Sequence, residues 1–349
     1  EGRRYAQISN IQDQDPALIP IELRGMCRQT DRGPDREAKG KWMLNPEDVI
    51  ASAPIADSFF EGFTERCVDV DDGHVFCRIK GDAPPLLLLH GYPQTSAIWH
   101  EVAPRLAEYF QVICADLHGY GQSSKPESCD RHLTYSKREM AKDLLGLMNH
   151  LGHAAFLIGA NDRGARVAHR LAADHPARVL GLATLDIAPT REMYRDATSA
   201  FAATYWHWYW LVQKAPFPEW MIDLDPRTFW IKKCCSGSAG SSPFARQPLE
   251  EYLRAFCDPA TIHACCEDYR AVYAIDIAHD DADQTKLQMP LLALWGANGA
   301  IAAHFDCLAL WREHADFVAG KPLQGGHYLV EEVPEAVLAE WVPFFAALV

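Results

Sequence analysis

The chain has 349 residues, of which 48% are hydrophobic and 23% charged, and its formal net charge is −14. This composition excludes a largely disordered chain, and the length allows a second unit beside one core domain. The negative charge argues against a general affinity for nucleic acid, and no apolar run approaches a membrane span, so we expect a small-molecule partner and no nucleic-acid or membrane partner.

The first elements in chain order are an extension and a hairpin. Residues 1–57 are rich in charge, Pro and Gly without a sustained period, which predicts an irregular N-terminal extension. FTERCVDV and HVFCRIK then flank the turn DDG as two short strands of a hairpin. The pattern of a folded domain therefore begins near residue 58.

Strand and helix patterns alternate from PLLLLHG onward, and the continuous apolar runs are typical of strands covered on both faces. Such alternation predicts a mostly parallel, doubly wound sheet of the α/β class. Aromatic, helix-like sequence interrupts the pattern and predicts a helical cap over the carboxyl ends of the strands. The predicted parts are a core at 58–189 and 286–349 and a cap at 190–285, with strands at 85–91, 111–116, 154–159, 179–186 and 289–296, and helices near 96–109, 134–151, 163–174 and 333–348.

The 11 cysteines are odd in number and include two adjacent pairs, which is unlike a disulfide framework and favours a reducing cytoplasm. His263 lies near Cys265 and Cys266, and a zinc site is the alternative to buried, inert thiols. Because the chain has no C-x-x-C pair, we expect neither a metal nor another cofactor.

The segment LIGANDRGARVAHR, residues 157–170, reads as a strand, a sharp turn and a helix, with Asp162 at the turn. A nucleophile elbow needs small residues two before and two after its central residue, and Ala160 and Gly164 meet that need. The competing interpretation is that Asp162 is a plain helix N-cap and that Arg163 and Arg166 form a solvated helix face.

Further motifs decide between these interpretations. They are HGYPQ, ADLHGYGQSS, LDIAPT, YWHWYW, KAPFPE, CEDYRA, LALWGANG and GGHYLVEE. In this order and with NDRGARV, they resemble the α/β hydrolases that cleave haloacids, most of all the fluoroacetate (haloacetate) dehalogenases, over residues 60–349. The resemblance implies an α/β-hydrolase fold and hydrolytic dehalogenation of a small 2-haloacid.

The resemblance also implies roles for individual residues. A carboxylate nucleophile gives an ester that water can cleave, whereas a serine alkoxide would leave a stable ether. Two guanidinium groups would offset the repulsion between the nucleophile and the substrate carboxylate. The implied roles are nucleophile for Asp162, base for His327, orienting acid for Asp186, carboxylate binding for Arg163 and Arg166, halide binding for His207, Trp208 and Tyr269, and an oxyanion or pocket position for Tyr92 and Asn161.

Several alternatives stay open. Asp186 alone could be a helix cap and His327 alone a structural loop histidine. An epoxide hydrolase would use the same Asp and His with two tyrosines of the cap, Tyr269 and one of Tyr205, Tyr209 and Tyr273. A haloalkane dehalogenase is less favoured because Arg163 follows the nucleophile, and a non-catalytic ligand-binding protein on this scaffold is the third alternative.

Asn161, Ala160 and Tyr92 depart from the residues usual in close relatives, which puts substrate size and rate in question. We expect Tyr205, Trp206, Tyr209 and Trp210 to serve in packing. The family resemblance, and nothing in the chain itself, implies a possible homodimer.

Overall fold

The structure is a computed structural model that describes residues 45–235 and 242–349. Its centre is an eight-stranded sheet with the order β1-β2-β4-β3-β5-β6-β7-β8, antiparallel at β1 and β2 and parallel from β4 to β8. This confirms the predicted α/β class and the hairpin. The strands are β1 (Thr64–Val70), β2 (Gly73–Lys80), β3 (Pro85–Leu89), β4 (Gln111–Ala115), β5 (Phe156–Asn161), β6 (Val179–Leu185), β7 (Leu291–Gly296) and β8 (Val318–Leu323).

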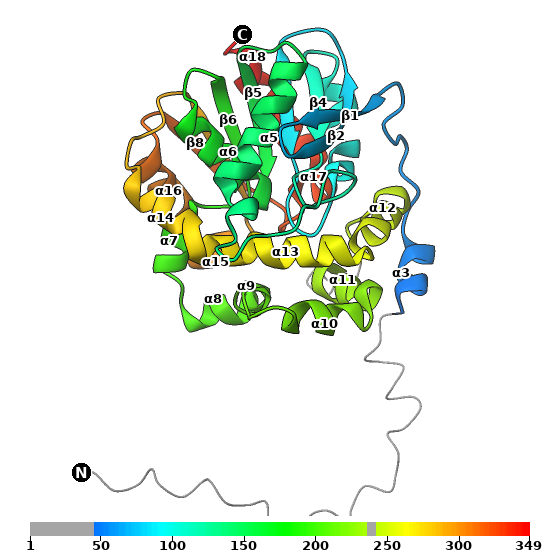
Figure 1. Ribbon diagram of the computed structural model, residues 1–349. Helices are drawn as coiled ribbons and strands as arrows, with labels where there is room; N and C mark the ends of the chain where they lie inside the picture. The colour runs from blue at the N-terminus through cyan, green and yellow to red at the C-terminus, as the bar shows by residue number, and fades with distance from the viewer. Residues whose placement is uncertain (1–44, 236–241) are drawn as a thin grey trace, which may run out of the picture. The chain divides into compact units, whose positions relative to one another are not determined.

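Helices cover both faces of the sheet, with α5 and α6 on one face and α18 on the other (Figure 1). This explains why the central strands are apolar throughout, since every residue of β5 is buried. The helices outside the long insertion are α3 (Pro46–Ser52), α4 (Ala103–Leu106), α5 (Lys137–His150), α6 (Asp162–Asp174), α15 (Ala300–His304), α16 (Cys307–His314), α17 (Leu329–Glu332) and α18 (Pro334–Ala346), with short 3-10 turns η2 (Ser96–His100) and η3 (Leu133–Tyr135).

Among the described residues between β6 and β7, the named elements are all helical, and these helices gather beyond one end of the sheet (Figure 1). Buried ion pairs fasten them to the core, such as Arg78 of β2 with Glu251 of α12 at 2.8 Å. We call them the inserted helices. They are α7 (Thr190–Arg195), α8 (Ser199–Thr204), α9 (Trp206–Leu211), α10 (Phe217–Asp223), α11 (Pro226–Cys235), α12 (Arg246–Phe256), α13 (Pro259–Ala271) and α14 (Ile277–Ala282), with the π-helical turn η4 (Val272–Asp276).

Three expectations about elements need correction. The helix expected near 96–109 is a 3-10 turn followed by α4, which restarts with Pro104 in its first turn. Strand β8 was not predicted, because it is an edge strand that contains Gly320, Lys321 and Pro322 and has little buried surface. The extension expected to be irregular contains α3, and residues 1–44 lie outside the described residues.

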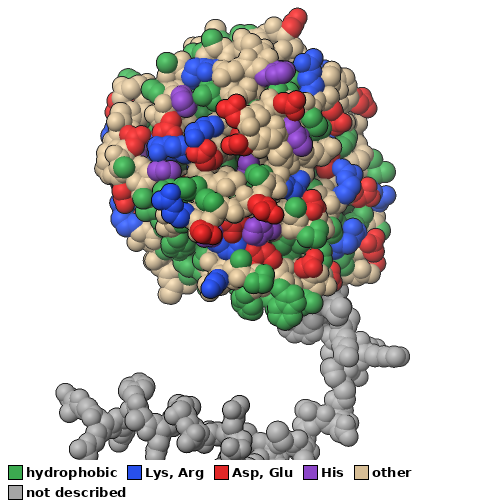
Figure 2. Space-filling model, in the orientation of Figure 1, with side chains coloured by type: hydrophobic (Ala, Val, Ile, Leu, Met, Phe, Trp, Pro, Cys, Tyr) green, Lys and Arg blue, Asp and Glu red, His purple; other side chains and the backbone are tan. Residues whose placement is uncertain are grey.

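Figure 2 shows acidic and basic side chains mixed over one face of the described part of the chain. Within that part, no helix is both long and apolar enough to cross a bilayer.

Candidate active site

The turn between β5 and α6 places Asp162 at the carboxyl end of a central strand. Strand β5 lies beside β3, at the point where the strand order reverses direction, which is where open α/β sheets bind ligands. Asp162 is buried and has a φ of +43°, a strained conformation for a residue with a side chain. A Cβ at Gly164 would lie 2.4 Å from the carbonyl oxygen of His90, so only glycine fits there. The predicted elbow geometry is therefore present.

The HGYPQ segment approaches Asp162 through its backbone. A Cβ at Gly91 would lie 2.6 Å from the Cβ of Asp162, and the backbone N–H of Tyr92 donates to Asp162 Oδ2 at 3.1 Å. Asn161 is buried next to the acid, and its Oδ1 has no hydrogen-bond partner among the described residues. The bond from Tyr92 holds one carboxylate oxygen and leaves Oδ1 as the oxygen that is available for attack.

Asp186 and His327 form the second part of the site. Asp186 follows β6 at a φ of +45°, and its Oδ1 accepts a hydrogen bond from the backbone N–H of Gly296 at 2.9 Å. His327 Nδ1 donates to Asp186 Oδ2 at 2.6 Å, which leaves Nε2 as the nitrogen that can accept a proton. Burial opposes the charged imidazole, but the bond to Asp186 and its negative charge outweigh this and raise the pKa of His327.

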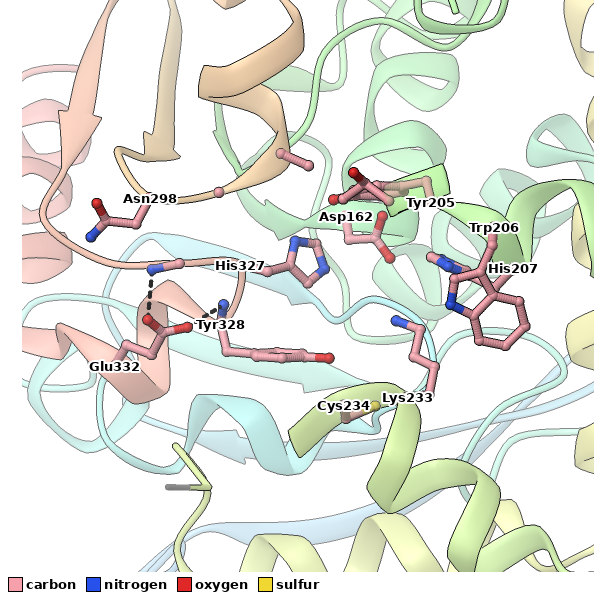
Figure 3. A pocket seen from close by; sticks show the side chains of 14 residues that line it. Asp162, Tyr205, Trp206, His207, Lys233, Cys234, Asn298, His327, Tyr328 and Glu332 are labelled. Atoms are coloured by element: carbon pink, nitrogen blue, oxygen red, sulfur yellow. Dashed lines mark hydrogen bonds between the residues drawn. The ribbon is translucent and has the colours of Figure 1, made fainter. Parts of the chain in front are cut away.

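A cavity of about 250 Å³ joins these groups, and Figure 3 shows His327 and Asp162 facing each other across it. The inserted helices form its other side, including His207 and Lys233. Arg163, Arg166, Trp208 and Tyr269 are absent from its lining. The cavity thus reaches Asp162 and His327, while neither arginine belongs to its lining.

Arg166 is buried on α6, one turn after Asp162, and lies with Cζ 4.7 Å from the ring centre of Trp208. Its Nη2 contacts Met193 Sδ at 3.5 Å, and its Nε and Nη1 have no hydrogen-bond partner in residues 45–235 and 242–349. Burial, and then the positive charge of Arg163, lower the pKa of Arg166. A guanidinium held in this way can bind an anion strongly.

Arg163 has a different environment. Its Nε donates to Asp268 Oδ2 at 2.9 Å and its Nη2 to Asp268 Oδ1 at 2.5 Å, while Nη1 has no partner among the described residues. Lys137 also pairs with Asp268, and Tyr120 Oη donates to it at 2.6 Å. The two arginines that the sequence suggested as equal partners therefore differ, because Asp268 already engages one of them.

The three residues predicted to bind halide are brought close to the arginines. The rings of His207 and Tyr269 are 5.9 Å apart, and Arg163 Cζ lies 4.2 Å from the ring centre of Tyr269. The indole N–H of Trp208 has no partner within the described chain. Burial, aided by the charge of Lys233, holds the pKa of His207 well below its usual value, so this ring is neutral with one N–H to donate.

Sequence reasoning missed or misjudged several residues here. Tyr205 and Trp206 line the cavity, although we expected them to serve in packing, with Tyr205 also a candidate for the epoxide alternative. Lys233, which was not singled out, lines it as well. Asp268 was also missed, although its place before Tyr269 in CEDYRA could have suggested a partner for a buried arginine. A signal for Lys233 is harder to find, since KK at the end of a helix is usually a solvated face.

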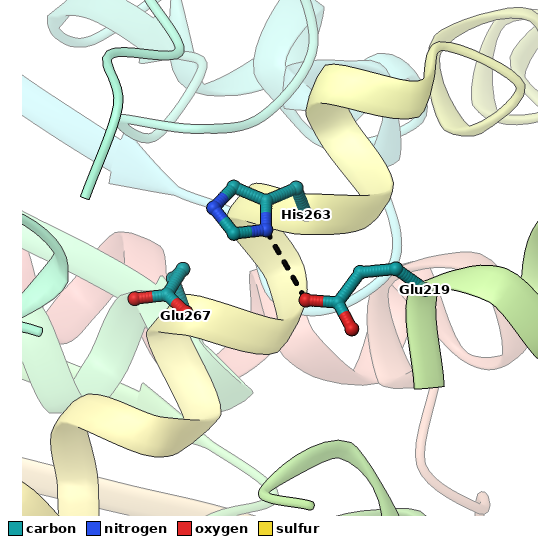
Figure 4. A group of neighbouring side chains, drawn as sticks. All are labelled: Glu219, His263 and Glu267. Carbon is teal, nitrogen blue, oxygen red and sulfur yellow. Dashed lines mark hydrogen bonds and ion pairs between the residues drawn. The ribbon is translucent and has the colours of Figure 1, made fainter. Parts of the chain in front are cut away.

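One group of side chains has metal-like spacing: Glu219, His263 and Glu267 (Figure 4). None of the three lines the cavity. Arg270 Nη1 lies 2.5 Å from Glu219 and 2.8 Å from Glu267, so the two carboxylates share the charge of one guanidinium. The neighbouring thiols Cys265 and Cys266 are buried, and burial raises the pKa of each, which disfavours the thiolate that zinc needs. This group is an ion-pair network.

Comparisons with known proteins agree with this fold. A family model described as the alpha/beta hydrolase fold matches residues 84–222. A solved chain from Nostoc sp PCC 7120, assigned to the α/β hydrolases, has 47% identity and a TM-score of 0.80, covering 82% of this chain and 99% of its own. Fold and site together thus define an α/β hydrolase.

Two curated relatives narrow the class. The fluoroacetate dehalogenase of Burkholderia sp is 44% identical over 79% of this chain and 91% of its own length. The soluble epoxide hydrolase of Corynebacterium sp. (strain C12) is 31% identical over 77% of this chain and 92% of its own. The chain belongs to the α/β-hydrolase family, in the branch that contains the fluoroacetate dehalogenases.

Proposed function

We propose that the protein hydrolyses the carbon–halogen bond of small 2-haloacids such as fluoroacetate and chloroacetate. The observation that carries the proposal is Arg166, a buried guanidinium with two donor nitrogens that lack a protein partner, one helical turn from Asp162. A carboxylate on the substrate would satisfy these donors and offset the cost of burying the charge. The relationship to the fluoroacetate dehalogenase of Burkholderia supports the same substrate class.

In the first step, Asp162 Oδ1 attacks the carbon that bears the halogen. The new carbon–oxygen bond forms as the carbon–halogen bond breaks, and the electron pair leaves with the halide. The N–H groups of His207 and Trp208 and the hydroxyl of Tyr269 would stabilise the departing halide. The result is an ester between Asp162 and the acid.

In the second step, His327 Nε2 takes a proton from water, and the hydroxide attacks Cγ of Asp162. Negative charge develops on Oδ2, where the N–H of Tyr92 already donates at 3.1 Å. The bond between Cγ and Oδ1 then breaks, the imidazolium protonates the departing alkoxide, and Asp162 releases a proton to solvent. Halide, one proton and the 2-hydroxyacid are the products.

The first experiment measures halide release from fluoroacetate and chloroacetate by the full chain, by Asp162→Asn and by Asp162→Ala. We expect turnover by the parent and a loss on the order of 10⁴-fold or more in both variants, because each removes the nucleophile. Folding of the variants is checked by circular dichroism. Unchanged halide release by Asp162→Ala would remove Asp162 from the mechanism.

Isotopic labelling separates attack by Asp162 from direct attack by water. In a single turnover in H₂¹⁸O, the mechanism places ¹⁸O in the peptide that contains Asp162 and leaves the hydroxyacid unlabelled. His327→Asn should stop the reaction at the ester, which adds the mass of the acid to that peptide. Label in the first hydroxyacid released would mean that water attacks the substrate carbon directly.

Epoxide hydrolysis is the second candidate, and the position of Tyr205 favours it. Tyr205 lines the cavity and Tyr269 is buried beside His207, so two hydroxyl groups could protonate an epoxide oxygen. Tyr273 is half exposed and Tyr209 does not line the cavity. A neutral epoxide would leave Arg166 without a partner, so dehalogenation is preferred. Diol from styrene oxide, with no halide from either acid, would reverse that preference.

A further inference from the structure

Lys233 is a cation inside the cavity that the proposed mechanism does not use. It lies near the end of α11, is half-buried, and lines the same cavity as Asp162, His207 and His327. Figure 3 shows its amine pointing into the space between the two histidines and toward the carboxylate of Asp162. Its Nζ lies 5.3 Å from the ring centre of Tyr92.

No carboxylate of the described chain forms an ion pair with Lys233, so its charge is available. The cavity lining contains two carboxylates, Asp162 and Glu332. Glu332 already accepts hydrogen bonds from the backbone N–H of Gly326 at 2.6 Å and of Tyr328 at 3.0 Å. The ammonium also acts on both imidazoles, since its charge disfavours protonation of His207 and of His327. Lys233 therefore contributes positive potential to the cavity.

The position of Lys233 differs from that of the arginines in a way that matters for an incoming anion. Lys233 lines the cavity and Arg163 and Arg166 do not, so Lys233 is the cation that an acid inside the cavity can contact directly. One water occupies about 30 Å³ of liquid, and the cavity has a volume of about 250 Å³. A haloacetate therefore fits in it beside Lys233. The chain carries a formal charge of −14, which repels an anion at long range and makes a local cation useful.

We propose that Lys233 is a substrate-positioning residue that binds the carboxylate of the incoming haloacid in the cavity, before the acid passes to Arg166. The inference rests on the proposed function for the identity of the anion. Because Lys233 binds the carboxylate of the substrate and not the reacting carbon, its loss acts mainly on kcat/KM, and kcat is compared at a pH where His327 is neutral in both proteins. Its contribution falls as salt screens the charge.

The test compares Lys233→Met with Lys232→Met, which makes the same change of charge one residue away on the exposed side of α11. For chloroacetate we expect Lys233→Met to lower kcat/KM about tenfold, with kcat within about twofold, because local potentials raise capture by factors of this order. Lys232→Met should leave both constants unchanged. Lys233→Arg should restore most of the loss, and the salt dependence of kcat/KM should be flatter in Lys233→Met.

Two controls define what would overturn the inference. Neutral 2-chloroacetamide should show no effect of Lys233→Met, and an equal loss for amide and acid would indicate damage to the fold. An equal loss in Lys232→Met, or a fall in kcat with KM unchanged, would also overturn the inference. The melting temperature of each variant shows whether the protein is folded.

Binding of acetate, which cannot react, separates this inference from the proposed function. We expect calorimetry to show acetate binding that Lys233→Met weakens about tenfold, in line with a charge-assisted contact. If acetate binding depends on Lys233 but no haloacid releases halide, the anion site stands and the proposed function fails. If halide is released but Lys233→Met changes neither acetate binding nor kcat/KM, the inference fails and the proposed function stands.

Discussion

Arg163 and Arg166 lie one turn apart on α6, yet they face two differently built regions of the interior. Around Arg163, the buried side chains of Lys137, Asp268 and Tyr120 form a paired cluster, which we call the ion cluster. Arg166 contacts Met193 and the indole ring of Trp208, and it forms no ion pair within residues 45–235 and 242–349. The difference shows that two residues of the same type on one helix can differ in pairing: Arg163 has a buried counter-charge, and Arg166 forms no ion pair among the described residues.

The largest expected effect is on stability, and it tests the ion cluster. Asp268→Asn leaves Arg163 as a buried cation without a counter-charge and leaves Lys137 only its ion pair with Asp276 at 3.4 Å, which should lower the free energy of unfolding by about 3–5 kcal/mol. Urea unfolding at pH 7 measures it. Glu139→Gln, which breaks a surface pair with Lys142, is the control and should cost less than about 1 kcal/mol. A similar small loss for Asp268→Asn would mean that the cluster does not differ from a surface pair.

The second-largest expected effect is on catalysis, and it tests the region around Arg166. Arg166→Leu should reduce kcat/KM for chloroacetate about 100-fold, since a charge-assisted pair with the substrate carboxylate is lost. The same variant should unfold at the same or a higher urea concentration, because the unpaired buried cation is gone. Kinetics with chloroacetate and 2-chloroacetamide check the first part. Equal losses for the charged and the neutral substrate would remove Arg166 from carboxylate binding.

The Asp186–His327 pair differs from both arginines because its positive charge depends on pH. His327 is charged below its pKa and neutral above it. The pKa of His327 is raised by Asp186 against the effect of burial, and the base must be neutral, so kcat should rise with pH through a value above about 6.5. The stabilising contribution of the charged pair is complete below about 6.5 and is lost as pH rises through the raised pKa.

The measurement is kcat against pH for the parent and for Asp186→Asn. The variant should lose most of its activity, and the acid limb of the remainder should move to lower pH. An acid limb at the same pH in both proteins would show that a group other than His327 is being titrated.

The smallest expected effect concerns Glu331, which, like Arg166, is a buried ionisable side chain. It accepts hydrogen bonds from Gln94 at 2.7 Å and Tyr252 at 2.9 Å, forms no ion pair with a Lys or Arg of the described chain, and burial raises its pKa to about 7. An acid, unlike a guanidinium, can give up its charge by binding a proton. The folded state then holds more protons than the unfolded state between about pH 4.5 and 7, so stability falls as pH rises through this window.

Glu331→Gln should therefore raise the melting temperature at pH 8 by a few degrees, a change on the order of 1 kcal/mol, and should change it little at pH 5. Glu335→Gln, on the exposed side of α18, should change neither value by more than about a degree. A gain for Glu331→Gln that is equal at both pH values would indicate an effect of shape rather than of charge.

The sequence predicted what local pattern determines. The apolar runs of β3 and β5 mark buried central strands, and the strand–turn–helix pattern with small residues at Ala160 and Gly164 marks the strained turn at Asp162. Edge strand β8 was not predicted, because its pairing with β7 needs few apolar side chains and so leaves no apolar pattern in the sequence.

The rest of the site depends on contacts between segments far apart in the chain. The ion-pair partner of Arg163 is Asp268, more than a hundred residues later in the chain. The residues next to Arg163 in the sequence do not predict this pair. Lys233 enters the cavity only because α11 packs over the HGYPQ segment, where Trp230 Nε1 donates to the carbonyl of Pro93 at 2.9 Å. The spacing of residues along the chain does not predict contacts between such distant segments.

The order of the acids along the chain has a consequence for how new specificities arise. Asp162 and Asp186 follow the adjacent strands β5 and β6, and both precede the inserted helices. Recombination between Pro189 and the start of β7 would exchange the whole wall that faces the substrate while the spacing of the two acids stays fixed. The exchanged helices must keep the counter-charges Glu251 for Arg78 and Asp268 for Arg163, and the loop of His327 must be re-fitted. Chimeras made at these two junctions under that condition offer a route to hydrolases with other substrates.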